Sequence, residues 1–237
     1  MAIYYLRESK IKRDLIFVEN DLLHHLRNVL RIKRGEVIKF FDEDFIYKAE
    51  CTEIEKDFLT FRIIEKSKKT SPKVQLQIVQ SIIDKSELED AIRFLVTTKV
   101  LQIILVKTER STNSLKEAQL KRLKEIILNT SEQSEICFIP ELQYFENLNK
   151  AISMFKENAF VLHFGSNLSL KDTVKIANLS KPITLFVGPE GGFSEKEIEI
   201  FNQNEIPSIT LKSGVFRSQF AGAIAVLTLL ELTYLLN

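Results

Sequence analysis

Residues 188–194, Gly-Pro-Glu-Gly-Gly-Phe-Ser, stand between an apolar run and a helix-start signal. The apolar run 184–187 predicts a buried strand, which Pro189 ends because proline cannot donate a hydrogen bond to a sheet. Ser194 and Glu197 have the spacing of a capping box, in which each side chain binds the other residue's backbone N–H. This part of the chain therefore predicts a strand, a glycine-rich turn and a helix, in that order.

The glycine-rich turn offers backbone N–H groups that suit an anion or the edge of an adenosine. Its glycines lack the G-x-G-x-x-G spacing of dinucleotide-binding folds and the Gly-Lys-Ser/Thr of phosphate loops, which excludes both of those classes. On these residues alone, a tight structural turn and a ligand-binding loop are equally compatible with the sequence.

Strand-like and helix-like runs alternate after residue 72. The expected strands are 74–83, 101–106, 160–164, 183–187 and 208–211, and the expected helices are 86–98, 115–131, 145–157, 170–177, 194–204 and 218–236. Because strands joined through helices run parallel, the pattern predicts an α/β domain over residues 73–237, with helices on both faces of a parallel sheet.

Residues 1–70 have a different pattern. Short aromatic and β-branched runs predict strands at 38–41, 45–50 and 58–63, and apolar residues at helical spacing predict one helix over 21–31. The run 66–72 is polar and basic and ends in proline, which predicts a linker. We therefore expect a small β-rich domain ahead of the α/β domain.

Composition narrows the class of protein. With 237 residues, 45% of them hydrophobic, and a net charge of +1, the chain can bury a core, and any nucleic-acid surface must be local. Cys51 and Cys137 match no metal-ligand spacing, so we expect free thiols in a cytoplasmic protein. Residues 1–7 lack the apolar core of a signal peptide. Residues 220–236 are slightly short for a membrane span and carry Glu231, which predicts a buried helix.

Several motifs follow one another in a family-like order. They are the heptapeptide with its capped helix, His-His-Leu-Arg-Asn-Val-Leu-Arg at 24–31 with Lys-Arg-Gly-Glu at 33–36, Thr-Glu-Arg-Ser at 108–111, Glu-Gln-Ser at 132–134, and Leu211 with Phe-Arg-Ser-Gln-Phe-Ala at 216–221. Together they resemble the 16S ribosomal RNA N3-methyluridine methyltransferase family (RsmE-type) of the knotted SPOUT class.

The resemblance implies a fold and an activity. The fold is a trefoil-knotted α/β methyltransferase domain over residues 73–237 with a PUA-like RNA-binding β-barrel over residues 1–70, assembled as a homodimer. The activity is methyl transfer from S-adenosylmethionine to N3 of a uridine in 16S ribosomal RNA of the small ribosomal subunit.

The same resemblance assigns three groups of site residues. Catalytic roles fall to Arg217 and Glu190, cofactor binding to Leu162, His163, Gly188, Glu190, Gly192, Leu211, Ser213 and Phe216, and RNA binding to His25, Arg27, Arg31, Lys33, Arg34, Arg110 and Arg217. A guanidinium fits phosphate or carbonyl oxygens, although Arg217 is also compatible with a surface ion pair. Glu190 fits either a brace that binds backbone N–H groups or an acceptor for the N3 proton.

The three histidines leave alternatives open. His163 ends an expected strand, where core packing and a place beside the cofactor fit equally well. The adjacent His24 and His25 point in different directions on a helix, so we expect no metal site but one packed and one exposed histidine.

Departures from the family pattern fall on positions that look functional. Phe94, Thr97 and Lys99 replace a lysine, a glutamate and a glycine, Ile136 and Gly214 replace arginines, Lys212 replaces a glycine, and Gln219 replaces a glutamate. A lysine at a glycine position is expected to crowd a cofactor unless the backbone angle there is ordinary. These departures leave a non-catalytic RNA-binding or ribosome-assembly paralogue as the alternative function, and a small-molecule α/β enzyme as a third.

Overall fold

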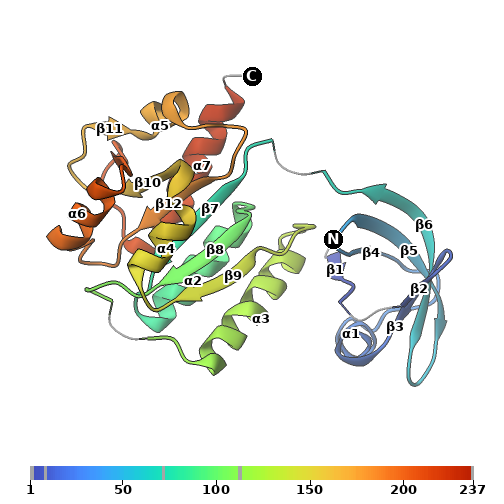
Figure 1. Ribbon diagram of the computed structural model, residues 1–237. Coiled ribbons are helices and arrows are strands. Elements are labelled where there is room, and N and C mark those ends of the chain that lie inside the picture. The colour runs from blue at the N-terminus through green and yellow to red at the C-terminus, as the bar shows by residue number, and fades with distance from the viewer. Residues whose placement is uncertain (1–2, 8–9, 71–72, 112–113, 236–237) are drawn as a thin grey trace. The chain divides into compact units, whose positions relative to one another are not determined.

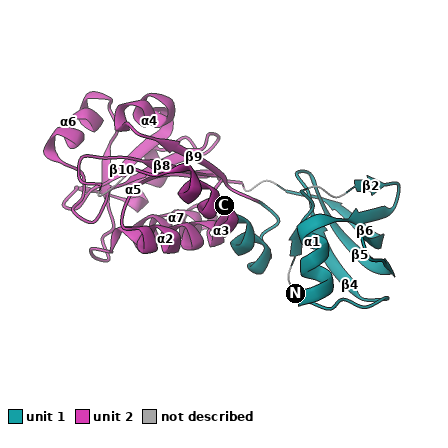
Figure 2. Ribbon diagram, turned by 90° about the horizontal axis from the view of Figure 1, so that it is seen from below, with its two compact units in different colours: residues 1–71, 128–138 teal, residues 72–127, 139–237 magenta. Residues whose placement is uncertain are grey.

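The computed structural model describes residues 3–7, 10–70, 73–111 and 114–235. The chain divides into two compact units, one formed by residues 1–71 and 128–138 and the other by residues 72–127 and 139–237 (Figures 1 and 2). They are called the first and second unit below.

The first unit contains a mostly antiparallel sheet. Its strands are β1 Ile3–Tyr5, β2 Lys10–Lys12, β3 Leu15–Val18, β4 Val37–Phe41, β5 Phe45–Ile54 and β6 Leu59–Lys68, in the spatial order β1-β4-β5-β6-β3-β2. Only the β1–β4 pair among these is parallel. The core beneath the sheet centres on Phe40 and Phe61, whose rings meet edge to face at 4.9 Å.

The expected linker at 66–72 is wrong for its first residues. Residues 66–68 continue β6 and pair with residues 45–47 of β5. The Nζ atom of Lys66 lies 3.7 Å from the centre of the Phe45 ring, so a basic side chain covers an aromatic one across the two strands. Basic residues that read as a linker are therefore the outer face of a long strand.

The expected helix over 21–31 is shorter and less regular. An α-helix, α1 Asn20–His24, continues directly into a π-helical turn, η1 His25–Val29. The wider π turn breaks the α-helical periodicity, so Val29 and Leu30 are 67% and 46% exposed although their spacing predicted a buried face. Arg31 lies beyond the helix with a positive φ of 54°.

The second unit contains the predicted parallel sheet, which is confirmed. Its strands are β7 Leu76–Ser81, β8 Gln102–Val106, β9 Glu141–Phe145, β10 Ala159–Leu162, β11 Leu168–Ser169, β12 Ile183–Val187 and β13 Ser208–Thr210, in the order β11-β13-β10-β12-β7-β8-β9. Every neighbouring pair given by this order is parallel. Because β12 and β7 are central and buried, their apolar runs were the clearest strand signals.

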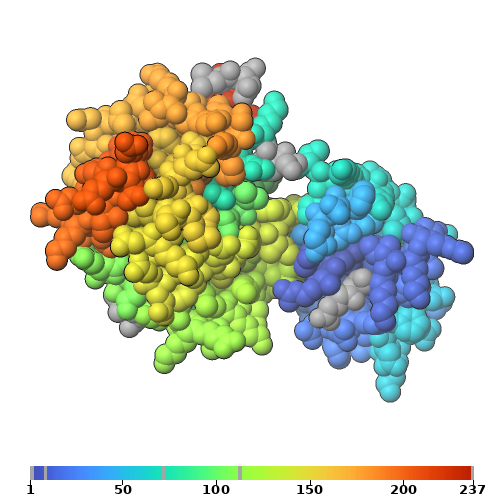
Figure 3. Space-filling view, viewed as in Figure 1, coloured from blue at the N-terminus to red at the C-terminus, as the bar shows by residue number. Residues whose placement is uncertain are grey.

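Helices cover both faces of this sheet (Figure 2). The second unit contains α2 Lys85–Thr97, α4 Leu148–Phe155, the short η2 Lys156–Asn158, α5 Leu170–Ile176, α6 Glu195–Gln203 and α7 Ser218–Tyr234, and α3 Glu117–Gln133 begins in it. Helices α4 and α6 share one apolar cluster with Phe186, and they lie side by side in Figure 3, α4 in yellow and α6 in orange. Val187 points to the opposite face, towards Gly222 of α7.

Two expectations about helices need correction. The helix expected over 145–157 begins at Leu148, because Phe145 ends strand β9 and Asn147 caps the helix, its side chain accepting from the N–H of Asn149 at 2.8 Å. Helix α7 is buried on one side only, since Leu227 and Tyr234 are 52% and 66% exposed. None of the described helices is both long and apolar enough to cross a membrane.

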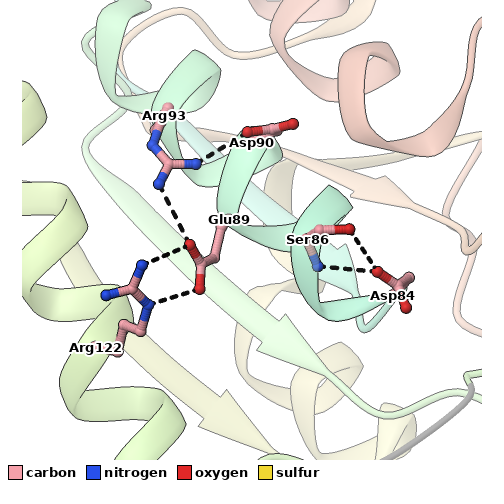
Figure 4. A network of polar contacts seen from close by, with 6 residues as sticks. All are labelled: Asp84, Ser86, Glu89, Asp90, Arg93 and Arg122. Carbon is pink, nitrogen blue, oxygen red and sulfur yellow. Dashed lines mark hydrogen bonds and ion pairs between the residues drawn. The ribbon is translucent and has the colours of Figure 1, made fainter.

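A polar network fixes the beginning of α2 (Figure 4). Glu89 of α2 accepts hydrogen bonds from Arg122 of α3, at 2.8 Å from Nε, and from Arg93, at 3.3 Å. The side chain of Asp84 caps the helix by accepting from the N–H of Ser86 at 2.9 Å. The first turn of α2 thus has a defined position beside the site described next.

Candidate functional site

Three loops at the carboxyl ends of neighbouring strands enclose a cavity of about 870 Å³. Residues 162–164 end and follow β10, residues 187–193 end and follow β12, and residues 209–211 and 214–218 end and follow β13. Ala221 of α7, Glu87 of α2 and Arg110, from the segment after β8, complete the wall. Open α/β sheets bind ligands at this edge, and the volume suits a nucleoside-sized ligand.

The turn after β12 depends on its glycines. Gly192 N–H donates to the Pro189 carbonyl at 2.9 Å, and Gly192 has a φ of +68°, a conformation that side chains disfavour. A Cβ atom on Gly188 would lie 3.1 Å from the backbone nitrogen of Phe193. The turn therefore folds back on itself so closely that a side chain on its first residue would push against the turn's own backbone.

Two side chains hold this turn from outside. The Arg110 guanidinium donates to the carbonyl oxygens of Gly191 and Phe193. Glu197 completes the predicted capping box with Ser194, which is confirmed, and its other carboxylate oxygen accepts from the N–H of Glu109 at 2.9 Å. The segment after β8 is thus joined to the turn by two hydrogen bonds and to the beginning of α6 by a third.

A buried polar chain lies next to the turn. Gln80 of β7 is 1% exposed, and its Nε2 donates to the Ser218 hydroxyl at 3.0 Å. Ser218, the first residue of α7, in turn donates to the Gly188 carbonyl at 2.5 Å. The chain ties the centre of the sheet, the turn and the beginning of α7 together.

Acidic and basic side chains meet at the mouth of the cavity. A carboxylate oxygen of Glu190 accepts from the N–H of Asp84 at 3.3 Å. Burial and a hydrogen bond that the protonated Glu87 carboxyl donates to the Glu190 carboxylate raise the pKa of Glu87, and the nearby Arg217 guanidinium opposes the change. Glu87 is half-buried, whereas Glu190 and Arg217 are exposed.

In the loop after β13, Lys212 does not crowd the cavity as expected. Lys212 has no positive φ, and its Nζ donates to the carbonyl oxygens of Ser166 and Asn167, both at 3.4 Å, so its side chain joins another loop and does not line the cavity. Gly214 has a φ of +140°, which explains why this chain has glycine there. Val215 lines the cavity and is 74% exposed.

Most of the sequence-predicted cofactor residues line the cavity. They are Leu162, His163, Gly188, Glu190, Gly192, Leu211 and Phe216, together with Arg110 and Arg217 from the other two groups. Ser213 is exposed and does not line it. Residues 162 and 188 are brought together because β10 and β12 pair in register.

The remaining RNA-binding candidates, His25, Arg27, Arg31, Lys33 and Arg34, belong to the first unit. The Arg27 guanidinium donates to the backbone carbonyls of Glu55 and Lys56, which occupies it structurally. The expectation of one packed histidine is wrong, because His24 and His25 are both exposed on the α1–η1 segment.

Some residues that line the cavity were not predicted from the sequence. Phe164, which is 75% exposed, and Val215 carry no local pattern that marks a site. One sequence signal involves Glu87: it stands three residues after Asp84, the spacing of a capping box. That spacing indicates the start of a helix and does not mark a site residue.

Comparison with known proteins decides the family. The sequence model described as the RNA methyltransferase domain matches residues 69–230. The chain belongs to this RNA methyltransferase family. A second model, the RNA methyltransferase PUA domain, matches residues 18–64. The protein is thus an α/β RNA methyltransferase with an N-terminal PUA-like domain.

Individual RNA methyltransferases agree with this. Ribosomal RNA small subunit methyltransferase E of Rickettsia conorii is 27% identical, with 86% of this chain and 84% of the relative covered. The enzyme of the same name from Aquifex aeolicus is 26% identical over 93% of this chain and 95% of its own. The crystal structure of that methyltransferase from Neisseria gonorrhoeae, bound to S-adenosyl methionine, has a TM-score of 0.87 at 24% identity and covers 98% of both chains. The resemblance found in the motifs is confirmed.

Proposed function

We propose that this RNA methyltransferase transfers a methyl group from S-adenosylmethionine to N3 of a uridine in 16S ribosomal RNA of the small ribosomal subunit. The observation that carries the proposal is the cavity at the carboxyl ends of β10, β12 and β13, one wall of which is the glycine turn 188–193. Relatives covering more than four fifths of this chain are named as small-subunit ribosomal RNA methyltransferases.

The residues present fit the cofactor. Gly188, Gly191 and Gly192 line the cavity without side chains, so a ligand can approach the backbone of the turn closely. Backbone groups and apolar atoms of five residues would hold S-adenosylmethionine, namely Leu162, Gly188, Gly192, Leu211 and Phe216. When bound, the cofactor supplies a methyl group already activated on a positively charged sulfur, so the protein contributes positioning and exclusion of water.

We assign Arg217 and Glu190 complementary roles at the mouth. Arg217 is exposed on the cavity wall, where its fork of donors would bind a phosphate or a uracil carbonyl of the RNA. Glu190 accepts a backbone N–H from Asp84, which supports the bracing role over that of a proton acceptor. The target base would enter out of its stack, because a cavity of about 870 Å³ suits a nucleoside-sized ligand and not a paired duplex.

We further propose two domains and a homodimeric assembly. Residues 1–70 would form the RNA-docking PUA-like domain, with His25, Arg27, Arg31, Lys33 and Arg34 contacting phosphates. Residues 73–237 would form the trefoil-knotted SPOUT domain of a cytoplasmic homodimer. Exposed Leu227 and Tyr234 on α7 support dimerisation, because they give that helix an apolar surface to bury.

Calorimetry with S-adenosylmethionine and its demethylated product tests cofactor binding first. Folded protein that binds neither overturns the proposal. Methyl incorporation into small subunits that lack the modification, with mapping of the methylated atom, then tests the reaction. Binding without methylation would favour the non-catalytic RNA-binding paralogue. Arg217→Ala should keep cofactor affinity and lose methylation, and a fully active variant removes Arg217 from the site.

A further inference from the structure

The first turn of α2 breaks a pattern that two other helices of the second unit follow. In α5 and α6 the third helical residue, Asp172 or Glu197, binds back to the backbone N–H of its own N-cap serine, which completes a capping box. Asp84 and Glu87 of α2 have the same spacing. There, however, the N–H of Asp84 donates to Glu190, at 3.3 Å.

Because Glu190 takes that N–H, Glu87 has no capping role and faces the cavity instead. Its half-buried side chain lines the cavity together with Glu190 and Arg217. Burial and the carboxyl group of Glu190 raise the pKa of Glu87, which makes its carboxylate a better base than an exposed one. Glu87 thus stands at a position that caps the helix in α5 and α6, but in α2 it lines the cavity, because Glu190 accepts the N–H of the N-cap residue Asp84.

We propose that Glu87 is the catalytic residue that accepts the N3 proton of the target uridine, an assignment that rests on the proposed function. The N3–H bond breaks and its proton passes to a carboxylate oxygen of Glu87. The electron pair of the N3–H bond stays on N3 and forms the new bond to the methyl carbon. The bond from that carbon to sulfur breaks, and its electrons remain on sulfur. The positive charge of the sulfonium is thereby balanced by the proton released.

Glu87 suits this role better than its neighbour Glu190. One oxygen of Glu190 already accepts from Asp84, and Glu190 is exposed on the turn. A carboxylate also selects the base, because uracil N3 carries a proton to donate whereas cytosine N3 is itself an acceptor and would repel Glu87. Glu87 would therefore contribute to both rate and choice of base.

Charged and titratable groups of several elements face Glu87 or share its cavity. They are Asp84 on α2, Glu190 in the turn after β12, Arg110 after β8, His163 after β10 and Arg217 before α7. Asp84 and Glu190 favour the protonated form of Glu87, and Arg217 favours its carboxylate. The pH dependence of the reaction therefore reports the whole group, and a substitution at position 87 is needed to isolate one member.

The experiment compares methyl transfer to small subunits by the full-length protein and by Glu87→Gln from about pH 6 to about pH 9. Loss of a general base lowers the rate by roughly 10² to 10⁴-fold, and that is the expected loss at neutral pH. The variant's rate should rise about tenfold per pH unit because hydroxide then removes the proton, whereas the wild-type rate should flatten. Glu87→Asp, which keeps a carboxylate, should recover the flattened profile.

The matched control is Asp90→Asn, the same chemical change on the same helix, at a residue paired with Arg93 and outside the cavity. It should keep the wild-type profile, and calorimetry with S-adenosylmethionine checks that every variant retains the folded site. A Glu87→Gln rate within about threefold of wild type, with the same profile, overturns the assignment while leaving the proposed function intact. Wild-type protein that binds cofactor and methylates no uridine N3 overturns both.

Discussion

The Ser218 hydroxyl stands between the Gly188 carbonyl, at 2.5 Å, and the Gln80 side-chain amide, at 3.0 Å. A hydroxyl that accepts one hydrogen bond and donates another uses both functions of the group. Since Gln80 belongs to β7 and Ser218 to α7, two elements far apart in the chain position the glycine turn through one buried oxygen atom.

Ser218→Ala should lower the free energy of unfolding by roughly 1–3 kcal/mol, because it leaves the half-buried Gly188 carbonyl without this donor. Urea unfolding measures the change, and cofactor affinity should fall with it. Ser153→Ala is the control, since that hydroxyl donates to the Lys150 carbonyl on an exposed surface and should change stability by less than about 0.5 kcal/mol. Equal effects of the two variants would refute the importance of the buried chain.

Gly188→Ala should destabilise the protein by roughly 1–3 kcal/mol, because the added methyl group meets backbone atoms of Gly192 and Phe193 at 3.2 and 3.1 Å. Gly191→Ala in the same turn is the comparison. Its methyl group would contact only the flexible Arg110 side chain, at 3.4 Å, so its unfolding free energy should change less. The reverse order in denaturant unfolding would contradict the packing described for the turn.

Lys99→Gly should stabilise the protein by about 1 kcal/mol. Lys99 follows the C-cap Thr98 of α2 with a φ of +60°, a left-handed conformation that costs a side chain about 1–2 kcal/mol and that glycine adopts freely. Lys121→Gly, inside α3, should have the opposite sign, with a loss of about 1 kcal/mol. Thermal unfolding measures the stability of both variants. A loss of stability in Lys99→Gly would disprove the backbone strain at Lys99.

Glu132→Gln should stabilise the first unit at neutral pH and change it little in acid. Burial raises the pKa of Glu132, and the Tyr5 N–H, 3.0 Å from its carboxylate, lowers it in part. A carboxyl whose pKa is raised by folding contributes stability that is present below its ordinary pKa and is lost as the pH rises through the raised value. Urea unfolding at about pH 4 and about pH 7 tests this. Glu199→Gln, the same change at an exposed position of α6, is the matched control.

Local patterns predicted the parts of the fold that local physics decides. The strand at 183–187 and the Ser194–Glu197 capping box were correct because an apolar run and a side chain three residues away act within one segment. Strand β9 was missed because its residues are half-buried or exposed at the edge of the sheet, where no apolar run is required. The first strands of the chain, β1 and β2, are only three residues long and gave no signal.

Contacts between distant segments explain the errors at the site. Glu87 was not predicted as a site residue, because Glu190, which accepts the Asp84 N–H in its place, lies 106 positions away in the sequence. Lys212 was expected to crowd the cofactor because nothing in the sequence directs its side chain to the Ser166 carbonyl. The cavity-lining glycines were found because a positive φ or a close backbone contact restricts the residue type itself.

The hydrogen bond from the Asp84 N–H to Glu190 also links ligand binding in the cavity to hydrogen exchange at the beginning of α2. The N–H of a helix N-cap is held by a residue of the glycine turn, so opening of the turn releases that amide to solvent. Any ligand that orders the turn must, by reciprocity, slow deuterium uptake at Asp84. The beginning of α2 can therefore report occupancy of the cavity through hydrogen exchange, at an amide that no ligand needs to touch.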